Sequence, residues 1–187
     1  MASRAPLWSL AVTTGMRRGE LVGLRWSDVD LEGGRLTVRR AVVTVRYEII
    51  ESDPKTEKSR RPIALDPRTI TILREWRVRQ LEERLLCGGG WIDTDAVFTR
   101  PDGSGLHPDR VSKLFDAAVA EAGVPRLRFH DVRHTWATMA LRVGVHPKIV
   151  SERLGHSSIQ ITLDIYSHIT EEQDREAAIR VAALMTR

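Results

Sequence analysis

The spacing of apolar residues predicts a mostly helical chain with one short strand-forming stretch. Apolar side chains recur at helical intervals in six segments, and a glycine ends several of them. These segments are residues 6–14, 17–24, 68–85, 107–123, 131–144 and 146–155. Residues 35–50 are instead rich in β-branched side chains and residues 61–65 form a short apolar run, which predicts two or three antiparallel strands with a turn over residues 52–59. Residues 96–98 predict a further short strand, so the fold class is α+β, with helices around one small sheet.

Two segments carry clear helix-end signals. Pro67 lies in the first turn of the helix expected at 68–85, and the CGGG sequence at 87–90 stops that helix. In the last segment, 170–185, Thr170 precedes several acidic residues and arginines come late, as capping and the helix dipole favour. We expect this terminal helix to dock on its own domain or to work between protomers.

Length and composition are those of one ordinary globular domain. The chain has 187 residues, with no internal repeat or low-complexity segment. It has no apolar run of about eighteen residues, so no membrane span is predicted. Cys87 is the only cysteine, which excludes an intrachain disulfide and a Cys-rich zinc site and is typical of a reducing cytoplasm.

The basic residues are nearly all arginine. The formal net charge is +4, and all but four of the 29 basic residues are Arg; the lysines are Lys55, Lys58, Lys113 and Lys148. Guanidinium groups match phosphate geometry better than ammonium groups do. A GC-rich genome would produce the same bias, so composition alone indicates a nucleic-acid partner only weakly.

Arg17 and Glu20 lie where a helix is expected to begin. Arg17 follows a glycine turn, and the free N–H groups at such a helix end favour anions. Glu20 is three residues further on, so it could orient the Arg17 guanidinium or simply support the helix charge. We interpret the adjacent Arg18 as a solvated surface charge.

The HDVRH sequence is the densest cluster of candidate side chains. His130 and Arg133 are three residues apart and project from one helical face. His130 and His134 have the spacing of a zinc-binding helix, but Asp131 stands where the general base Glu of that motif is needed, so a zinc hydrolase is a minor alternative. We expect His134 to be a buried helix histidine with a local hydrogen bond.

Tyr166 ends the series of candidates. His156 lies in an LGH sequence ten residues before Tyr166. The other tyrosine, Tyr47, lies in the β-rich stretch, where an aromatic residue is expected for packing. Two arginines, a lysine and two histidines could hold a phosphodiester while the Tyr166 phenol attacks it.

The sequences TGMRRGELVGLRW, PKTEKSRRPIAL, RFHDVRHTWAT and LGHSSIQITLDIYSH resemble the tyrosine recombinase (phage integrase) family from about residue 14 to 170. The resemblance implies the family's catalytic-domain fold, with helices around a small antiparallel three-stranded sheet. Family members usually carry an N-terminal core-binding domain, and often an arm-binding domain, which this chain is expected to lack. The resemblance also implies that Tyr166 is the nucleophile and that Lys55, in a K-T-x-x-S-x-R pattern, is the general acid, with Lys58 the second choice.

By the same resemblance, Arg17 and Arg133 clamp the scissile phosphate, His130 handles the tyrosine proton and His156 donates to the phosphate; His168 has no assigned role. The implied activity is site-specific DNA cleavage and rejoining through a 3′-phosphotyrosine, on double-stranded DNA and with self-association into a dimer or tetramer synapse. No cofactor, metal, membrane or small-molecule substrate is expected, and the setting is the cytoplasm of a bacterium, with a bacterial or phage gene. A type IB topoisomerase and a non-catalytic DNA-binding module are the alternatives.

Overall fold

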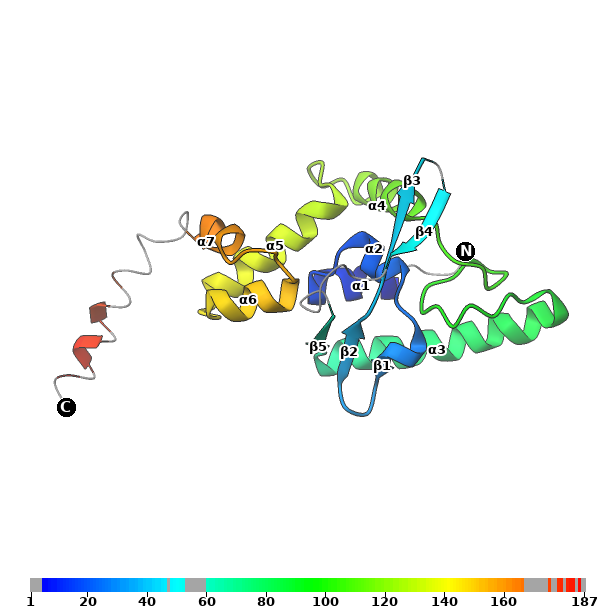
Figure 1. Ribbon diagram of the computed structural model, residues 1–187, viewed down its shortest axis with the longest axis horizontal. Coiled ribbons are helices and arrows are strands. Elements are labelled where there is room, and N and C mark those ends of the chain that lie inside the picture. The colour runs from blue at the N-terminus through cyan, green and yellow to red at the C-terminus, as the bar shows by residue number, and fades with distance from the viewer. Residues whose placement is uncertain are drawn as a thin grey trace. The chain divides into compact units, whose positions relative to one another are not determined.

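A computed structural model describes residues 5–46, 48–52 and 60–166, together with 175, 178, 179, 181–183 and 185. It divides into two compact units, Met1–Trp136 and Ala137–Arg187, which are described separately here (Figure 1). Tyr47, Lys55, Lys58, His168 and Thr170 lie outside the described residues.

Helices account for more of the described residues of the first unit than strands do. They begin with α1 (Ala5–Thr14), the short α2 (Arg18–Val22) and the 3-10 turn η1 (Trp26–Asp28). The long α3 (Pro67–Cys87), the 3-10 turn η3 (Gly88–Gly90), α4 (Pro108–Glu121) and α5 (Phe129–Arg142) follow, and the range of α5 crosses the boundary between the units. The helices predicted from apolar spacing are confirmed, and α3 has the predicted Pro67 in its first turn, with Asp66 accepting from the Thr69 N–H at 3.0 Å.

The strands form two small antiparallel sheets (Figure 1). The first has the order β1 (Val29–Asp30), β2 (Arg35–Val38), β5 (Arg61–Ala64), with Leu36 opposite Ile63. The second is the hairpin of β3 (Ala41–Val45) and β4 (Glu48–Ser52). The predicted fold class, with its three-stranded sheet, is confirmed. The hairpin is additional, and residues 96–98 form no strand, since Ala96 makes only an isolated bridge to Arg25.

The β-branched stretch is broken at Arg39 and Arg40, where the chain leaves the first sheet. Both side chains turn to the buried Asp28 carboxylate of η1, and Arg40 also pairs with Glu51 at 2.9 Å. A carboxylate this buried needs cationic partners. These ion pairs lie where β2 ends and β3 begins.

The core of this unit lies between α1, α3 and the three-stranded sheet. Leu10, Leu36, Ile63 and Leu73 are fully buried there. Trp76 of α3 donates to the Val97 carbonyl at 2.6 Å, which ties the helix to the segment after it. This core fixes α1 and β5, the two elements that flank the candidate site.

The second unit contains the end of α5 with α6 (Pro147–Leu154) and α7 (Gln160–Tyr166). Leu141, Val150 and Leu154 are buried in it, as is the Thr162 side chain, which is 0% exposed. Gly144 and Gly155 follow the two helices with positive φ of 83° and 66°, a conformation that glycine adopts without strain. Within the described ranges, no helix is both long and apolar enough to cross a membrane.

Candidate active site

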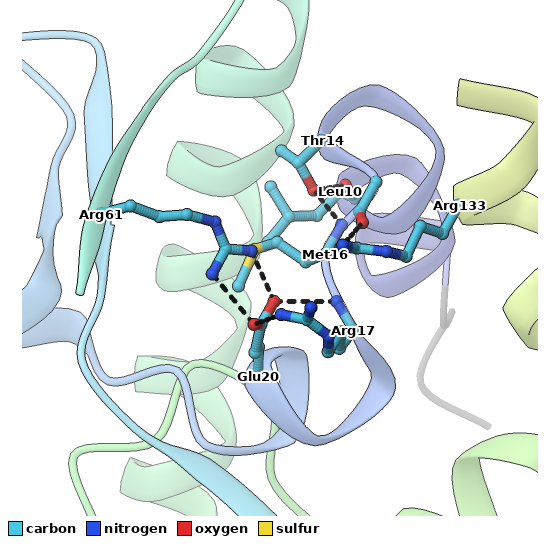
Figure 2. Close-up of polar contacts among 8 residues, drawn as sticks. Leu10, Thr14, Met16, Arg17, Glu20, Arg61 and Arg133 are labelled. Carbon is cyan, nitrogen blue, oxygen red and sulfur yellow. Dashed lines mark hydrogen bonds and ion pairs between the residues drawn. The ribbon is translucent and has the colours of Figure 1, made fainter. Parts of the chain in front are cut away.

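The turn between α1 and α2 carries the first site residues. Gly15 has a φ of 65° and ends α1, as predicted. Its carbonyl accepts from the Arg133 Nη1 at 2.9 Å, and the carbonyl of Thr13 accepts from the Trp136 indole at 3.0 Å. Two side chains of α5 are thus anchored to this turn, which brings Arg17 and Arg133 together although they are far apart in sequence (Figure 2).

Arg17 precedes the first residue of α2, and Glu20 lies in that helix's first turn. The Glu20 carboxylate accepts from the Arg17 N–H at 2.9 Å and from the Arg17 Nη1 at 2.9 Å. The Arg17 N–H, at the helix end that the sequence predicted to favour anions, is thus occupied by the Glu20 carboxylate. Of the two roles considered for Glu20, the contact geometry favours orientation of the Arg17 guanidinium.

A third arginine shares this carboxylate. Arg61 donates to both Glu20 oxygens, at 3.0 and 2.8 Å, and the Arg61 and Glu20 side chains are each only 6% exposed (Figure 2). These hydrogen bonds and the Arg61 charge hold the pKa of Glu20 below its usual value although burial acts in the opposite direction and is the largest single influence. Arg17, Glu20, Arg61 and Arg133 are called the arginine cluster below.

Helix α2 is held in place on two sides. Gly19 lies so close to β3 that a Cβ there would be 2.5 Å from the Val42 carbonyl oxygen. Arg18 pairs with Asp109 at 3.2 Å and donates to Ser112 at 2.7 Å, both on α4. Arg18, interpreted from the sequence as a solvated surface charge, is 38% exposed and in addition connects α2 to α4.

A small cavity brings three of the predicted site residues together. It has a volume of about 210 Å³ and is lined by Met16, Arg17, Arg18, Phe129, His130 and Arg133. Desolvation, followed by the Arg17 charge, lowers the pKa of Arg133 to about 9, while Glu20 acts in the opposite direction. Partial burial, followed by the charges of His134 and Arg133, also lowers the pKa of His130. The cavity therefore places a neutral imidazole beside a positive charge that little solvent stabilises, which favours a bound anion.

A wider groove adjoins this cavity between α2 and β3. Its volume is about 570 Å³, and Arg17, Arg18 and Arg46 line it with residues 41–44, Gly19 and one acid, Asp109. Arg17 borders both spaces. A chain of phosphates could therefore run along the groove with one phosphate in the cavity.

His130 and His134 have their rings in an edge-to-face contact, with centroids 4.8 Å apart. His134 is exposed, so its predicted burial was wrong. Among the described residues, no group of three or more His, Cys, Asp or Glu side chains is arranged to hold a metal ion.

The second unit holds two further predicted site residues, His156 and Tyr166. His156 follows α6, and Tyr166 is the last residue of α7. The His156 Nδ1 lies 2.8 Å from the hydroxyl of the buried Thr162, which is four residues before Tyr166 on the same helix. The hydrogen bond thus ties the His156 ring to the helix that carries Tyr166.

Two residues of this arrangement had no predicted role. Arg61 is the last residue of the K-T-x-x-S-x-R sequence and alternates with the buried Ile63 in β5, a pattern that places an arginine on the inward face of a strand. Thr162 is part of the sequence around His156 and Tyr166. The sequence patterns around Arg61 and Thr162 could have drawn attention to them. Their partners, Glu20 and His156, were not identifiable from the sequence.

The comparisons with known proteins agree with this arrangement. Residues 2–173 match the model of the phage integrase family. The chain is 39% identical over 183 residues to the tyrosine recombinase XerC-like protein of Caldanaerobacter subterraneus subsp. tengcongensis, covering 91% of this chain and 47% of that protein. It is 33% identical over 175 residues to the putative prophage phiRv2 integrase of Mycobacterium tuberculosis. That match covers 94% of this chain and 45% of the relative. The chain thus spans about half the length of these relatives.

Solved structures show the same fold. The Tn1549 transposon integrase in complex with transposon right end DNA superposes with a TM-score of 0.83 and 22% identity, over 96% of this chain and 59% of that one. The XerH site-specific recombinase bound to its difH substrate superposes with a TM-score of 0.66 and 26% identity. The match covers 92% of this chain and 45% of that one. Because the motifs occur in order and the family model matches nearly the whole of this chain, with the same fold in solved structures, the chain belongs to the phage integrase family.

Proposed function

We propose that this chain is the catalytic domain of a site-specific DNA recombinase that cleaves and rejoins strands through a 3′-phosphotyrosine. The observation that carries the proposal is the cavity where Arg17, His130 and Arg133 meet. Three guanidinium groups and one carboxylate form the arginine cluster beside it, so positive charge exceeds negative charge at a place sized for a phosphate.

In the proposed reaction, the Tyr166 phenolic oxygen attacks the scissile phosphorus and the bond to the 5′ oxygen breaks. His130 accepts the phenol proton, a task for which its lowered pKa suits it because the imidazole is neutral at pH 7. Lys55 gives a proton to the departing 5′ oxygen. Arg17 and Arg133 stabilise the charge on the non-bridging oxygens, and His156 donates to the same phosphate.

The proposed partner is double-stranded DNA. Arg17, Arg18 and Arg46 along the groove beside the cavity support this, because phosphate contacts supply most of the affinity of such a surface. Among structural neighbours, a lambda integrase is described as a dimer bound to a core site. We extend such self-association on DNA to this chain, together with a cytoplasmic setting in a bacterium.

Covalent trapping tests the proposal. A nicked duplex that loses its 5′-hydroxyl fragment after cleavage should leave an SDS-resistant protein–DNA adduct with the wild type. Tyr166→Phe should form no adduct yet bind the duplex normally, because only the nucleophilic oxygen is lost. Tyr47→Phe, the change of the other tyrosine, is the matched control and should react as the wild type does.

The other outcomes separate the alternatives. An adduct with Tyr166→Phe means that the nucleophile is wrongly assigned. Binding without any adduct from the wild type points to a non-catalytic DNA-binding module. Relaxation of supercoiled plasmid without exchange between two sites points to a type IB topoisomerase activity.

A further inference from the structure

Arg61 occupies a position where an arginine needs a specific reason. In β5, Arg61 and Ile63 are buried while Pro62 and Ala64 are exposed, so the guanidinium lies on the inward face of the sheet. Opposite it in β2 is Val38, which is 3% exposed. A buried charge in such surroundings is costly unless it is paired.

Arg61 and Arg17 together direct four donors at the Glu20 carboxylate, counted over the part of the chain that the structure describes. Two come from the Arg61 fork, at 3.0 and 2.8 Å, and two from Arg17, its backbone N–H and its Nη1. Four donors match the approximate capacity of a carboxylate. The carboxylate is therefore fixed in both position and rotation, and through it so is the Arg17 guanidinium.

Arg61 also changes the net charge of the arginine cluster. If Glu20 had only Arg17 as its partner, the two charges would cancel and Arg133 would be left as the cluster's one net positive charge. With Arg61 paired to Glu20 through two parallel hydrogen bonds, the carboxylate is already balanced. Arg17, whose side chain is 42% exposed and borders the cavity, then keeps its charge for an incoming anion.

We propose that Arg61 is a positioning residue for the phosphate-binding arginines: it neutralises Glu20 so that Arg17 and Arg133 retain their charge, and it locks the Glu20 carboxylate that orients Arg17. The inference rests on the proposed function, because it concerns the phosphate that the recombination reaction would cleave. Arg61 also joins α2 to the start of β5, six positions after Lys55 in the sequence.

The test compares Arg61→Met with Arg61→Lys and with the double variant Glu20→Gln/Arg61→Met. Arg61→Met leaves Glu20 unbalanced, so Arg17 should be drawn into neutralising it. Arg61→Lys keeps the charge but loses the fork. The double variant removes both charges, while the Gln carbonyl can still accept from Arg17. Arg74→Met is the matched control, since Arg74 pairs with Glu32 on the surface.

The first readout is binding of inorganic phosphate at constant ionic strength, followed by the rise in melting temperature. Arg61→Met should bind phosphate about tenfold more weakly than the wild type, the scale of one lost charge interaction in a partly buried site. Arg61→Lys and the double variant should each recover most of this loss, and Arg74→Met should show none. Circular dichroism confirms which variants are folded before each titration.

The second readout is single-turnover cleavage of two duplexes, one with an ordinary scissile phosphate and one with a neutral methylphosphonate there. The defect of Arg61→Met should be larger on the phosphate than on the methylphosphonate, because the neutral linkage makes less use of the arginine charge. A purely structural role would reduce cleavage of both duplexes by the same factor.

Four results overturn the inference. They are phosphate binding by Arg61→Met equal to that of the wild type, a double variant no better than Arg61→Met, a cleavage defect of Arg61→Met that is equal on both duplexes, and no phosphate binding by the wild type at all. If phosphate binding follows the expected pattern but the wild type forms no covalent adduct on DNA, the proposed function fails and the positioning role of Arg61 stands.

Discussion

Replacing Arg133 with Met should raise the thermal stability of the anion-free protein while it abolishes cleavage. Arg133 is only 5% exposed, and its pKa is lowered to about 9, first by desolvation and then by the Arg17 charge. A buried charge near like charges favours the unfolded chain, in which water solvates it fully. Methionine keeps an unbranched, though shorter, side chain and removes that charge, so the fold should gain stability where the reaction loses a phosphate clamp.

The size of the gain follows from two opposing contributions. Each pKa unit is worth about 1.4 kcal/mol, so the lowered pKa of Arg133 corresponds to roughly 5 kcal/mol of unfavourable charge burial at neutral pH. Against this, the variant leaves the buried Gly15 carbonyl without the Arg133 donor, which costs about 1–3 kcal/mol. The net gain should be about 2 kcal/mol or more, and the melting temperature should rise by roughly 4–8 °C for a chain of this length.

The assay is thermal unfolding by circular dichroism at pH 7 in a buffer without multivalent anions. The folded pKa of Arg133, about 9, lies below its unfolded value, so the unfolded state binds more protons at every pH between the two values. Stability linked to Arg133 is therefore lost at neutral pH and regained above about pH 9. The difference between the wild type and Arg133→Met should shrink in that range.

Arg84→Met is the control, because Arg84 makes an exposed pair with Asp93 and should change the melting temperature little. Added phosphate should stabilise the wild type but not Arg133→Met, because the clamp is absent. A melting temperature of Arg133→Met below that of the wild type, with native circular dichroism retained, would refute the reasoning, since it would mean that the Gly15 hydrogen bond outweighs the buried charge.

Two further predictions concern residues that act beside the phosphate. Lys55→Ala should slow cleavage strongly but be rescued in part by a 5′-bridging phosphorothiolate, whose thiolate leaves without a proton; equal loss on both substrates would argue that Lys55 only binds phosphate or that Lys58 is the acid. Thr162→Val should reduce single-turnover cleavage roughly tenfold, because the His156 Nδ1 loses its 2.8 Å hydroxyl partner at little change in buried volume. Thr162→Ser should restore most of that rate, and a Ser variant as slow as the Val variant would exclude the hydroxyl as the cause.

The helices of this fold were readable from the sequence because their signals are local. Apolar spacing located α3, α4 and α5, and glycines such as Gly15 and Gly144 marked helix ends through their backbone freedom. The two sheets were not readable in the same way. Strand pairing joins residues far apart, so the apolar spacing did not reveal that β2 pairs with β5 while β3 pairs with β4, or that the apolar run 96–98 makes only an isolated bridge to Arg25.

The candidate site residues, like the helices, could be predicted from the sequence, whereas their contacts, like the strand pairing, could not. The order of Arg17, Lys55, His130, Arg133, His156 and Tyr166 in the chain indicated the family and the proposed chemistry without any coordinates. Only the tertiary structure placed Glu20 between Arg17 and Arg61, turned Arg18 towards α4 and set Thr162 against His156. A sequence records which charged side chains are available, whereas their pairing and desolvation depend on which elements pack together, and those neighbours decide whether a guanidinium binds substrate or holds another residue in place.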